Sequence, residues 1–163
     1  MIRFLLLALT LFACACNTGH KTVRVIDQGL TADTQAAVDA WNEKLDATCP
    51  GVSLTLVDSD EADITVTYGL TSIENSLATT SHDRERIVVN LKALTLENTP
   101  RAERGESLYA VRGALTHEFG HALGAEHSAD EADVMFPKTF PGNAPELTSH
   151  DVWQVCRLYD GVP

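Results

Sequence analysis

The segment 117–127 reads HEFGHALGAEH, and it constrains the local fold more than any other part of the chain. His117 and His121 are four residues apart, so on a helix they lie one turn above each other on the same face. His127 could not reach the same point if that helix continued straight. Gly124 resolves this, because glycine adopts a positive φ at a helix C-terminus and lets the chain turn back. The segment therefore predicts a helix that ends at Gly124 and a loop that returns His127 to it.

The same spacing predicts the chemistry of the site. Three neutral imidazoles are the ligands that a catalytic zinc ion takes when its fourth position is left for water. Glu118 lies about 100° around the helix from His117, beside the metal, where a carboxylate acts as general base on that water. A bare H-E-x-x-H pattern fixes only three positions, and the following G-x-x-H makes the signal specific. We predict one Zn²⁺ held by His117, His121 and His127, with Glu118 as the catalytic residue.

The length and charge of the chain bound the other classes of function. With 163 residues, it is expected to form one domain, large enough to bury a core without depending on disulfides or metal ions for stability. Its formal net charge of −11 argues against binding to nucleic acid, which depends on Lys and Arg neutralising phosphates. We interpret the acidic surface as a solubility feature, and we expect a monomer.

Residues 1–15 have the features of a secretory signal peptide. One arginine precedes an apolar run over residues 4–12, which is too short to span a bilayer as a helix. In one interpretation an A-x-A cleavage site leaves Cys16 at the start of the mature chain. In the other, the sequence LFAC resembles a bacterial lipoprotein signal, in which Cys14 is lipidated and anchors the protein to a membrane. Cys14 and Cys16 are the candidate lipidation sites, and we expect an exported protein, as a cell-envelope lipoprotein or in secreted form.

Alternation and helical periodicity place the other elements along the chain. Strands are expected at residues 23–26, 52–57, 64–68, 77–81 and 87–91, and helices at 33–47, 108–123 and 148–159. The first helix carries an apolar stripe of Val38, Trp41 and Leu45. The last begins with Thr148 and Asp151 in a pattern like a capping box. This order predicts an α/β sandwich, in which a twisted and largely parallel sheet is backed by helices.

Three further features leave alternatives open. The acidic loop 58–63 could bind calcium, but it lacks the spacing of a calcium loop such as an EF-hand, so a solvated turn is expected. Cys49 and Cys156 lie in the globular part, where they pair in an oxidising compartment or else remain as buried free thiols. The remaining histidines are expected at the surface: His20, His82 and His150.

A second motif follows the histidine segment. His127 is followed by Ser128 and then by DVMFP at 133–137. This arrangement resembles the metzincin peptidases, with Met135 at the position of their Met-turn. Pro137 makes it similar to the matrixin branch, the family of matrix metalloproteinases. The resemblance implies that residues 16–163 form a metzincin-like catalytic domain with a zincin fold: a twisted, mixed, mostly parallel five-stranded sheet and three main helices.

The resemblance also implies a function. It predicts a zinc-dependent endopeptidase in which Glu118 takes a proton from the attacking water and passes it to the leaving amine. A peptide or protein substrate would extend along an edge strand near residues 77–81. The family fold also implies that Cys49 and Cys156 are close enough to form a disulfide. Two alternatives use the same scaffold, a non-catalytic binding module and a zinc hydrolase of a non-peptide amide.

Overall fold

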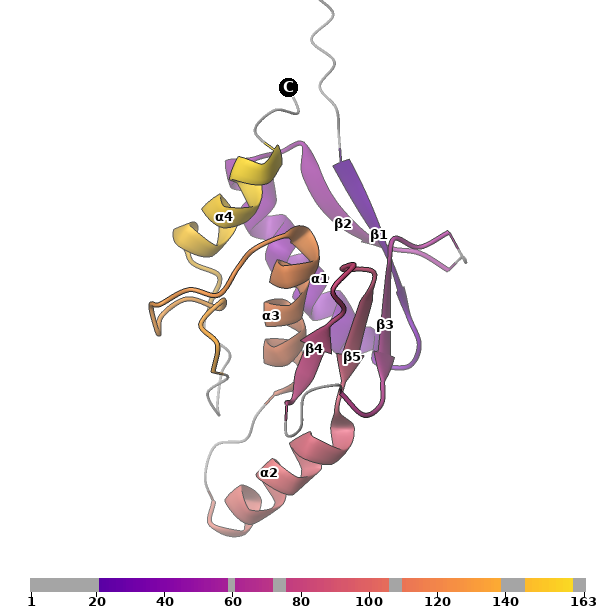
Figure 1. Ribbon diagram of the computed structural model, residues 1–163, viewed down its shortest axis with the longest axis vertical. Helices are drawn as coiled ribbons and strands as arrows, with labels where there is room; N and C mark the ends of the chain where they lie inside the picture. Colours follow the sequence, from indigo (N-terminus) through magenta and orange to yellow (C-terminus); the bar gives the residue numbers. More distant parts are fainter. Residues whose placement is uncertain (1–20, 59–60, 72–75, 106–109, 139–145, 160–163) are drawn as a thin grey trace, which may run out of the picture.

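The computed structural model describes residues 21–58, 61–71, 76–105, 110–138 and 146–159 (Figure 1). The expected signal segment lies outside these ranges, as do Cys14, Cys16 and His20. Within them the chain forms five strands and four helices. Their order is β1 (Lys21–Asp27), α1 (Thr31–Thr48), β2 (Val52–Leu56), β3 (Ile64–Tyr68), β4 (Ala78–Thr80), β5 (Arg86–Val89), α2 (Leu91–Glu103), α3 (Val111–Leu123) and α4 (Ser149–Tyr159). In this part of the chain, no helix combines the length and the apolar character needed to cross a membrane.

The five strands form one mixed sheet in the order β2-β1-β3-β5-β4. β2, β1, β3 and β5 run parallel, so that Val23 pairs with Leu54 and Val66 pairs with Ile87. β4 runs antiparallel to β5 and forms one edge of the sheet. The predicted fold class, a mostly parallel five-stranded sheet backed by helices, is therefore confirmed.

The core lies on one face of this sheet. Alternate strand residues such as Val25, Leu54 and Val66 are buried, while their neighbours in sequence are at least partly exposed. This period of two is typical of a sheet that is covered on one side. Helices α1 and α3 cover that side (Figure 1). Trp41 of α1 is fully buried, and its indole donates to Thr116 O of α3 at 2.8 Å. This bond ties α1 to α3 next to the first predicted ligand.

Helix α4 packs on α1 and α3, and two pairs of residues hold it there. Cys49, at the end of α1, forms a disulfide with Cys156 of α4. At the start of α4, Asp151 N donates to Thr148 Oγ1 at 3.2 Å, and Thr148 N donates to Asp151 Oδ2 at 2.9 Å. These reciprocal bonds form the capping box that the sequence predicted. The capping box thus fixes the beginning of the last helix, and the disulfide ties Cys156, further along it, to the end of α1.

The expectation of three main helices is wrong, because residues 91–103 form a fourth, α2. The polar composition and Pro100 predict a connecting stretch, and the sequence pattern places Leu91 in the preceding strand, which ends at Val89. Asn90 begins the helix instead, since its side chain accepts a hydrogen bond from Ala93 N at 3.0 Å. Pro100 lies near the C-terminal end, where its missing N–H removes one helical bond without breaking the helix. With few buried residues, α2 has no clear apolar stripe by which to recognise it.

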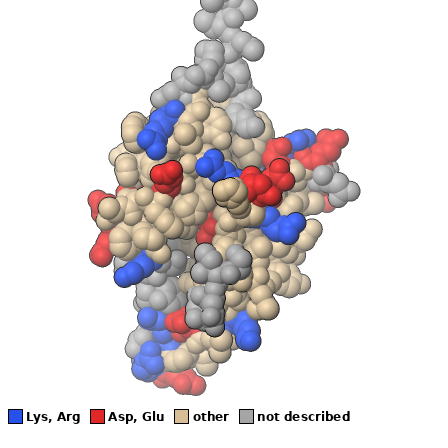
Figure 2. Space-filling model, in the orientation of Figure 1, with Lys and Arg blue, Asp and Glu red and all other residues tan. Residues whose placement is uncertain are grey.

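The acidic loop before β3 pairs with an arginine of the same sheet. Arg24 of β1 donates to both carboxylate oxygens of Asp63 at 3.2 Å, and its guanidinium lies 3.3 Å from Glu61 Oε2. Both carboxylates are exposed, so these pairs contribute little to stability. Glu61 and Asp63 therefore pair with Arg24, while residues 59 and 60 of the same loop lie outside the described residues. Figure 2 shows that acidic and basic side chains are interspersed over the face that it draws.

Candidate metal centre

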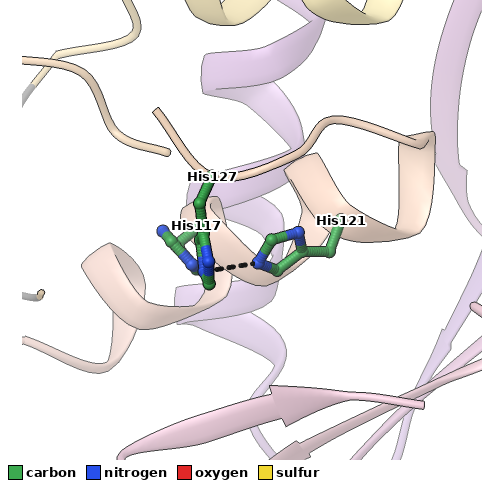
Figure 3. A group of neighbouring side chains, drawn as sticks. All are labelled: His117, His121 and His127. Atoms are coloured by element: carbon green, nitrogen blue, oxygen red, sulfur yellow. Dashed lines mark hydrogen bonds between the residues drawn. The ribbon is translucent and has the colours of Figure 1, made fainter. Parts of the chain in front are cut away.

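Helix α3 carries two predicted ligands, His117 and His121, and ends where the sequence requires. Gly124 has a φ of 102°, in the left-handed region that favours glycine. Gly124 N donates to His121 O at 2.9 Å, and Ala125 N donates to Gly120 O at 2.8 Å. This pair of bonds forms a Schellman motif, which closes the helix and reverses the chain. The reversal brings the loop residue His127 back beside the two helical histidines (Figure 3).

The three imidazoles converge on one point. Their candidate ligand atoms all lie within 4.8 Å of one another. His121 Nε2 is 3.1 Å from His127 Nε2, the contact dashed in Figure 3. Two nitrogens at about 2.0–2.1 Å from a tetrahedral zinc ion are about 3.3 Å apart. The observed separation therefore fits two ligands of one ion. Among the residues that the structure describes, no other three His, Cys, Asp or Glu side chains come together in this way.

Backbone carbonyls orient two of the three rings. His117 Nδ1 lies 2.7 Å from Val134 O, and His121 Nδ1 lies 2.9 Å from Ala125 O. A carbonyl oxygen only accepts, so each Nδ1 carries the proton and each Nε2 keeps its lone pair. This is how histidine ligands are commonly oriented in metal sites. Three neutral nitrogen donors arranged in this way suit Zn²⁺.

Burial favours the neutral form of His117 and of His127. It is the largest of the causes that lower the pKa of His117 from 6.5 to about 4, and nearby His121 and His127 act in the same direction. The hydrogen bond to Val134 O opposes the shift. Burial, followed by the charge of His121, also lowers the pKa of His127. Because a metal binds the neutral imidazole, His117 and His127 need not lose a proton to act as ligands at neutral pH.

Glu118 is held beside the histidines and shielded from solvent. The residue is 7% exposed. Burial raises the pKa of its carboxyl group, and the hydrogen bond from Thr80 and the charge of His121 oppose that shift. Thr80 Oγ1 of β4 lies 2.6 Å from Glu118 Oε2 and 3.0 Å from Glu118 O. A carboxylate with a raised pKa next to a metal site is suited to accept and return a proton.

Met135 packs against α3 at a point where the helix has no side chain. It is fully buried. A Cβ added to Gly120 would lie 2.2 Å from Met135 Sδ and 3.1 Å from Trp41 Cζ2. Gly120 lies between His117 and His121 in the sequence, and because it has no side chain, Met135 Sδ can approach the helix backbone there. Met135 thus packs directly against the α3 backbone at Gly120.

Asp151 links the segment that carries Met135 to helix α4. Its side chain is fully buried and accepts hydrogen bonds from Val134 N and Met135 N, at 3.0 Å each. It also accepts from Thr148 N at 2.9 Å. Val134 O is the acceptor that orients His117. The buried Asp151 carboxylate thus holds the backbone segment whose carbonyl, Val134 O, orients the His117 ring.

Asp133 performs a similar task at the other end of the loop. It is 4% exposed and accepts hydrogen bonds from the hydroxyls of Ser128 and Thr148. His150 Nδ1 lies 2.7 Å from its Oδ2. Ser128, the residue after His127, also donates its N–H to Met135 O at 2.8 Å. His150 is exposed, as expected of a surface residue, and through Asp133 it also contacts the loop that carries His127.

Sequence reasoning missed four residues that shape this site. Thr80 has no local pattern that points to Glu118, because the two are 38 residues apart and meet only in the folded chain. Gly120 lies inside the signature, yet its role depends on Met135. The sequence pattern identifies Asp151 only as a helix cap, and Asp133 only as part of the DVMFP motif. A capping carboxylate that also serves a second segment has no signal in local sequence.

A cleft of about 450 Å³ opens beside the histidines. Thr80, Ser81 and His82 line one wall, at the end of β4 and in the turn after it. The other wall includes His121, Glu126 and His127. His82 therefore faces the cleft and is not part of the histidine cluster.

Comparisons with known proteins agree with this geometry. A family model described as Matrixin (Peptidase_M10) matches residues 14–160. Matrix metalloproteinase-27 of Tupaia belangeri is 39% identical over 70 residues, which cover 41% of this chain and 13% of that protein. Metalloendoproteinase 1-MMP of Arabidopsis thaliana is 41% identical over 63 residues, which cover 37% of this chain and 17% of that protein. The matched segments thus span less than a fifth of either relative.

Proposed function

Because this chain belongs to the matrixin family, we propose that it is a zinc-dependent endopeptidase. The observation that carries the proposal is the meeting of three histidine side chains beside one buried carboxylate. His117, His121 and His127 come from a helix and a loop that a Schellman turn brings together. Glu118 lies next to them and is almost fully buried. A binding module would need none of this acid–base machinery, and the chain retains all of it.

The proposed mechanism assigns a task to each group. His117, His121 and His127 would hold Zn²⁺, since Nδ1 of His117 and of His121 is bonded to a backbone carbonyl, which leaves the lone pair of Nε2 for the metal. Zinc bound there supplies Lewis acidity toward water and the scissile carbonyl. Glu118 takes the proton of the attacking water and then gives it to the leaving amine. Burial raises the pKa of Glu118, which favours uptake of the proton from water.

The edge strand β4 offers a place for an extended substrate. Leu77 O accepts from Asn90 N, and Ser81 N donates to Arg86 O, so the odd-numbered residues of this strand bond to β5. In an antiparallel pair, the residues between them point their N–H and C=O groups the other way. Ala78 and Thr80 therefore direct their backbone groups to the edge. The Ala78 carbonyl already accepts a hydrogen bond from the Ser76 hydroxyl, so Thr80 is the residue at which a peptide can add as a further strand. The cleft lies at the end of this edge.

Digestion of a diverse peptide library, analysed by mass spectrometry, tests the proposed function. The protein should cut peptides at internal bonds, lose this activity when a chelator removes zinc, and regain it when zinc is restored. Cleavage of amide-linked cell-wall fragments without cleavage of peptides would favour the non-peptide hydrolase instead. A protein that binds zinc and cuts neither class would be a binding module.

We also propose that residues 1–15 direct export and that the mature chain, residues 16–163 or longer by two residues, is the catalytic domain. The lipoprotein interpretation places the anchor on Cys14. One acyl chain binds a membrane only marginally, so a stable anchor needs more than one chain on that residue. Mass spectrometry of the N-terminal peptide distinguishes the two forms, because an unmodified chain that starts at Cys16 would mean ordinary secretion.

A further inference from the structure

The side-chain contact from Thr80 to Glu118 crosses from the edge strand to the active-site helix. Thr80 Oγ1 is 2.6 Å from Glu118 Oε2, within the range of a hydrogen bond from a hydroxyl to a carboxylate. Among the described residues, no other side chain forms a hydrogen bond with this carboxylate. Glu118 is nearly buried, so water has limited access to compete for the same oxygen. The orientation of the carboxylate thus depends on one hydroxyl.

We propose that Thr80 is a positioning residue for the general base, a role that rests on the proposed peptidase function. The Glu118 side chain turns about three bonds, and the Thr80 hydroxyl selects one arrangement by occupying Oε2. Oε1 is then left to accept the proton of the attacking water. A general base must lie within hydrogen-bond reach of that proton, so holding one oxygen determines where the other acts.

The position of Thr80 in β4 makes the arrangement possible. The Thr80 backbone groups point away from β5, whereas its side chain leaves the sheet on the face covered by α3. The same hydroxyl also lies 3.0 Å from Glu118 O, so it faces both the helix backbone and the side chain. Thr80 additionally lines the cleft. The residue at which a substrate strand would add is therefore the residue that orients the base.

The contact also ties β4 to α3, so the experiment must separate a catalytic effect from a structural one. Thr80→Val keeps the shape of the side chain and removes its hydroxyl, and Thr80→Ser restores the hydroxyl. Thr79→Val is the matched control, because Thr79 is the neighbouring strand residue and points to the opposite face of the sheet. For each variant, kcat and KM are measured on a cleaved library peptide, together with bound zinc and Tm.

Thr80→Val should lower kcat roughly 10- to 100-fold, as expected when a reacting group is displaced by about 1 Å. Its KM, zinc content and Tm should stay close to those of Thr79→Val, and Thr80→Ser should recover most of kcat. In a Glu118→Asp background, the shortened carboxylate no longer reaches the hydroxyl, so Thr80→Val should cause little additional loss. An unchanged kcat in Thr80→Val, or an equal loss in the Glu118→Asp background, would overturn the proposal.

Crystal structures of the zinc-loaded wild type and of Thr80→Val test the same idea without turnover. The Glu118 carboxylate should move or adopt several conformers when the hydroxyl is absent. An unchanged, single carboxylate position would contradict the positioning role. If the wild type cuts no peptide, the proposed function fails, whereas this structural comparison still decides the role of Thr80.

Discussion

Asp151→Asn tests whether a buried carboxylate on α4 supports the metal site from a distance. Asp151 is fully buried and accepts hydrogen bonds from three backbone N–H groups: Thr148 at 2.9 Å, and Val134 and Met135 at 3.0 Å. Asparagine has nearly the same shape, but it offers one accepting oxygen and one NH₂ group. In either orientation, the NH₂ group faces at least one of these donors, and all three bonds lose their assistance from charge.

The structure sets the size of the effect. A buried N–H that loses its acceptor costs about 1–3 kcal/mol, and hydrogen bonds to a charged group are worth roughly 1 kcal/mol more than neutral ones. The relief from burying a charge offsets part of this sum. We expect Asp151→Asn to lower the free energy of unfolding by about 2–4 kcal/mol. For a domain of this size, that corresponds to a decrease in Tm of roughly 4–16 °C.

The variant should also bind zinc less tightly. The Val134 backbone that Asp151 holds is the one that orients His117. Loss of such indirect support typically costs about 10- to 100-fold in metal affinity. Urea denaturation of the zinc-free protein and competition with a zinc chelator measure the two effects. Asp46→Asn, which changes an exposed carboxylate of α1, is the control and should leave both unchanged. Wild-type stability and zinc affinity in Asp151→Asn would refute the reasoning.

Three further predictions follow from the same structure. Gly124→Ala should destabilise the protein by about 1–3 kcal/mol in urea denaturation, because alanine is strained at a φ of 102° and its Cβ would lie 2.5 Å from Leu158 Cδ1. The free energy of unfolding of the zinc-free protein should fall by on the order of 3 kcal/mol between pH 6.5 and 4. The cause is that His117 takes up a proton in the unfolded chain but stays neutral in the folded protein, where its pKa is lowered to about 4. In His117→Gln, measured over the same pH range, this part of the loss should disappear. Replacing Cys49 and Cys156 by serine should cost up to about 4–5 kcal/mol on the chain-entropy model, and an unchanged urea midpoint would contradict this.

Local spacing was sufficient for the elements whose reason lies within one segment. Gly124 ends α3 because the signature needs a reversal three residues after His121, and the helix does end there. The alternation in β1 and β3 reflects a sheet buried on one face. Helix α2 was missed because its start depends on one Asn90 cap and its sequence lacks a periodic apolar stripe.

The parts of the site that the sequence did not reveal depend on contacts between distant segments. Asp151 is a helix cap by local pattern, but its second task is to hold backbone N–H groups 16 and 17 residues earlier. Thr80 meets Glu118 only because β4 lies at the sheet edge beside α3. Such pairings follow from topology, which no local motif in either segment encodes.

The most direct test of the account compares bound zinc and peptide turnover in the wild type, Glu118→Ala and His127→Ala. Glu118→Ala should retain one zinc ion, since the three histidines are untouched, and should lose on the order of 10²–10⁴-fold or more in turnover. His127→Ala should instead bind zinc weakly, because two helical histidines leave the ion under-coordinated. A Glu118→Ala protein that holds zinc and cuts peptides at nearly the wild-type rate would contradict the central claim that Glu118 is the general base of a zinc peptidase.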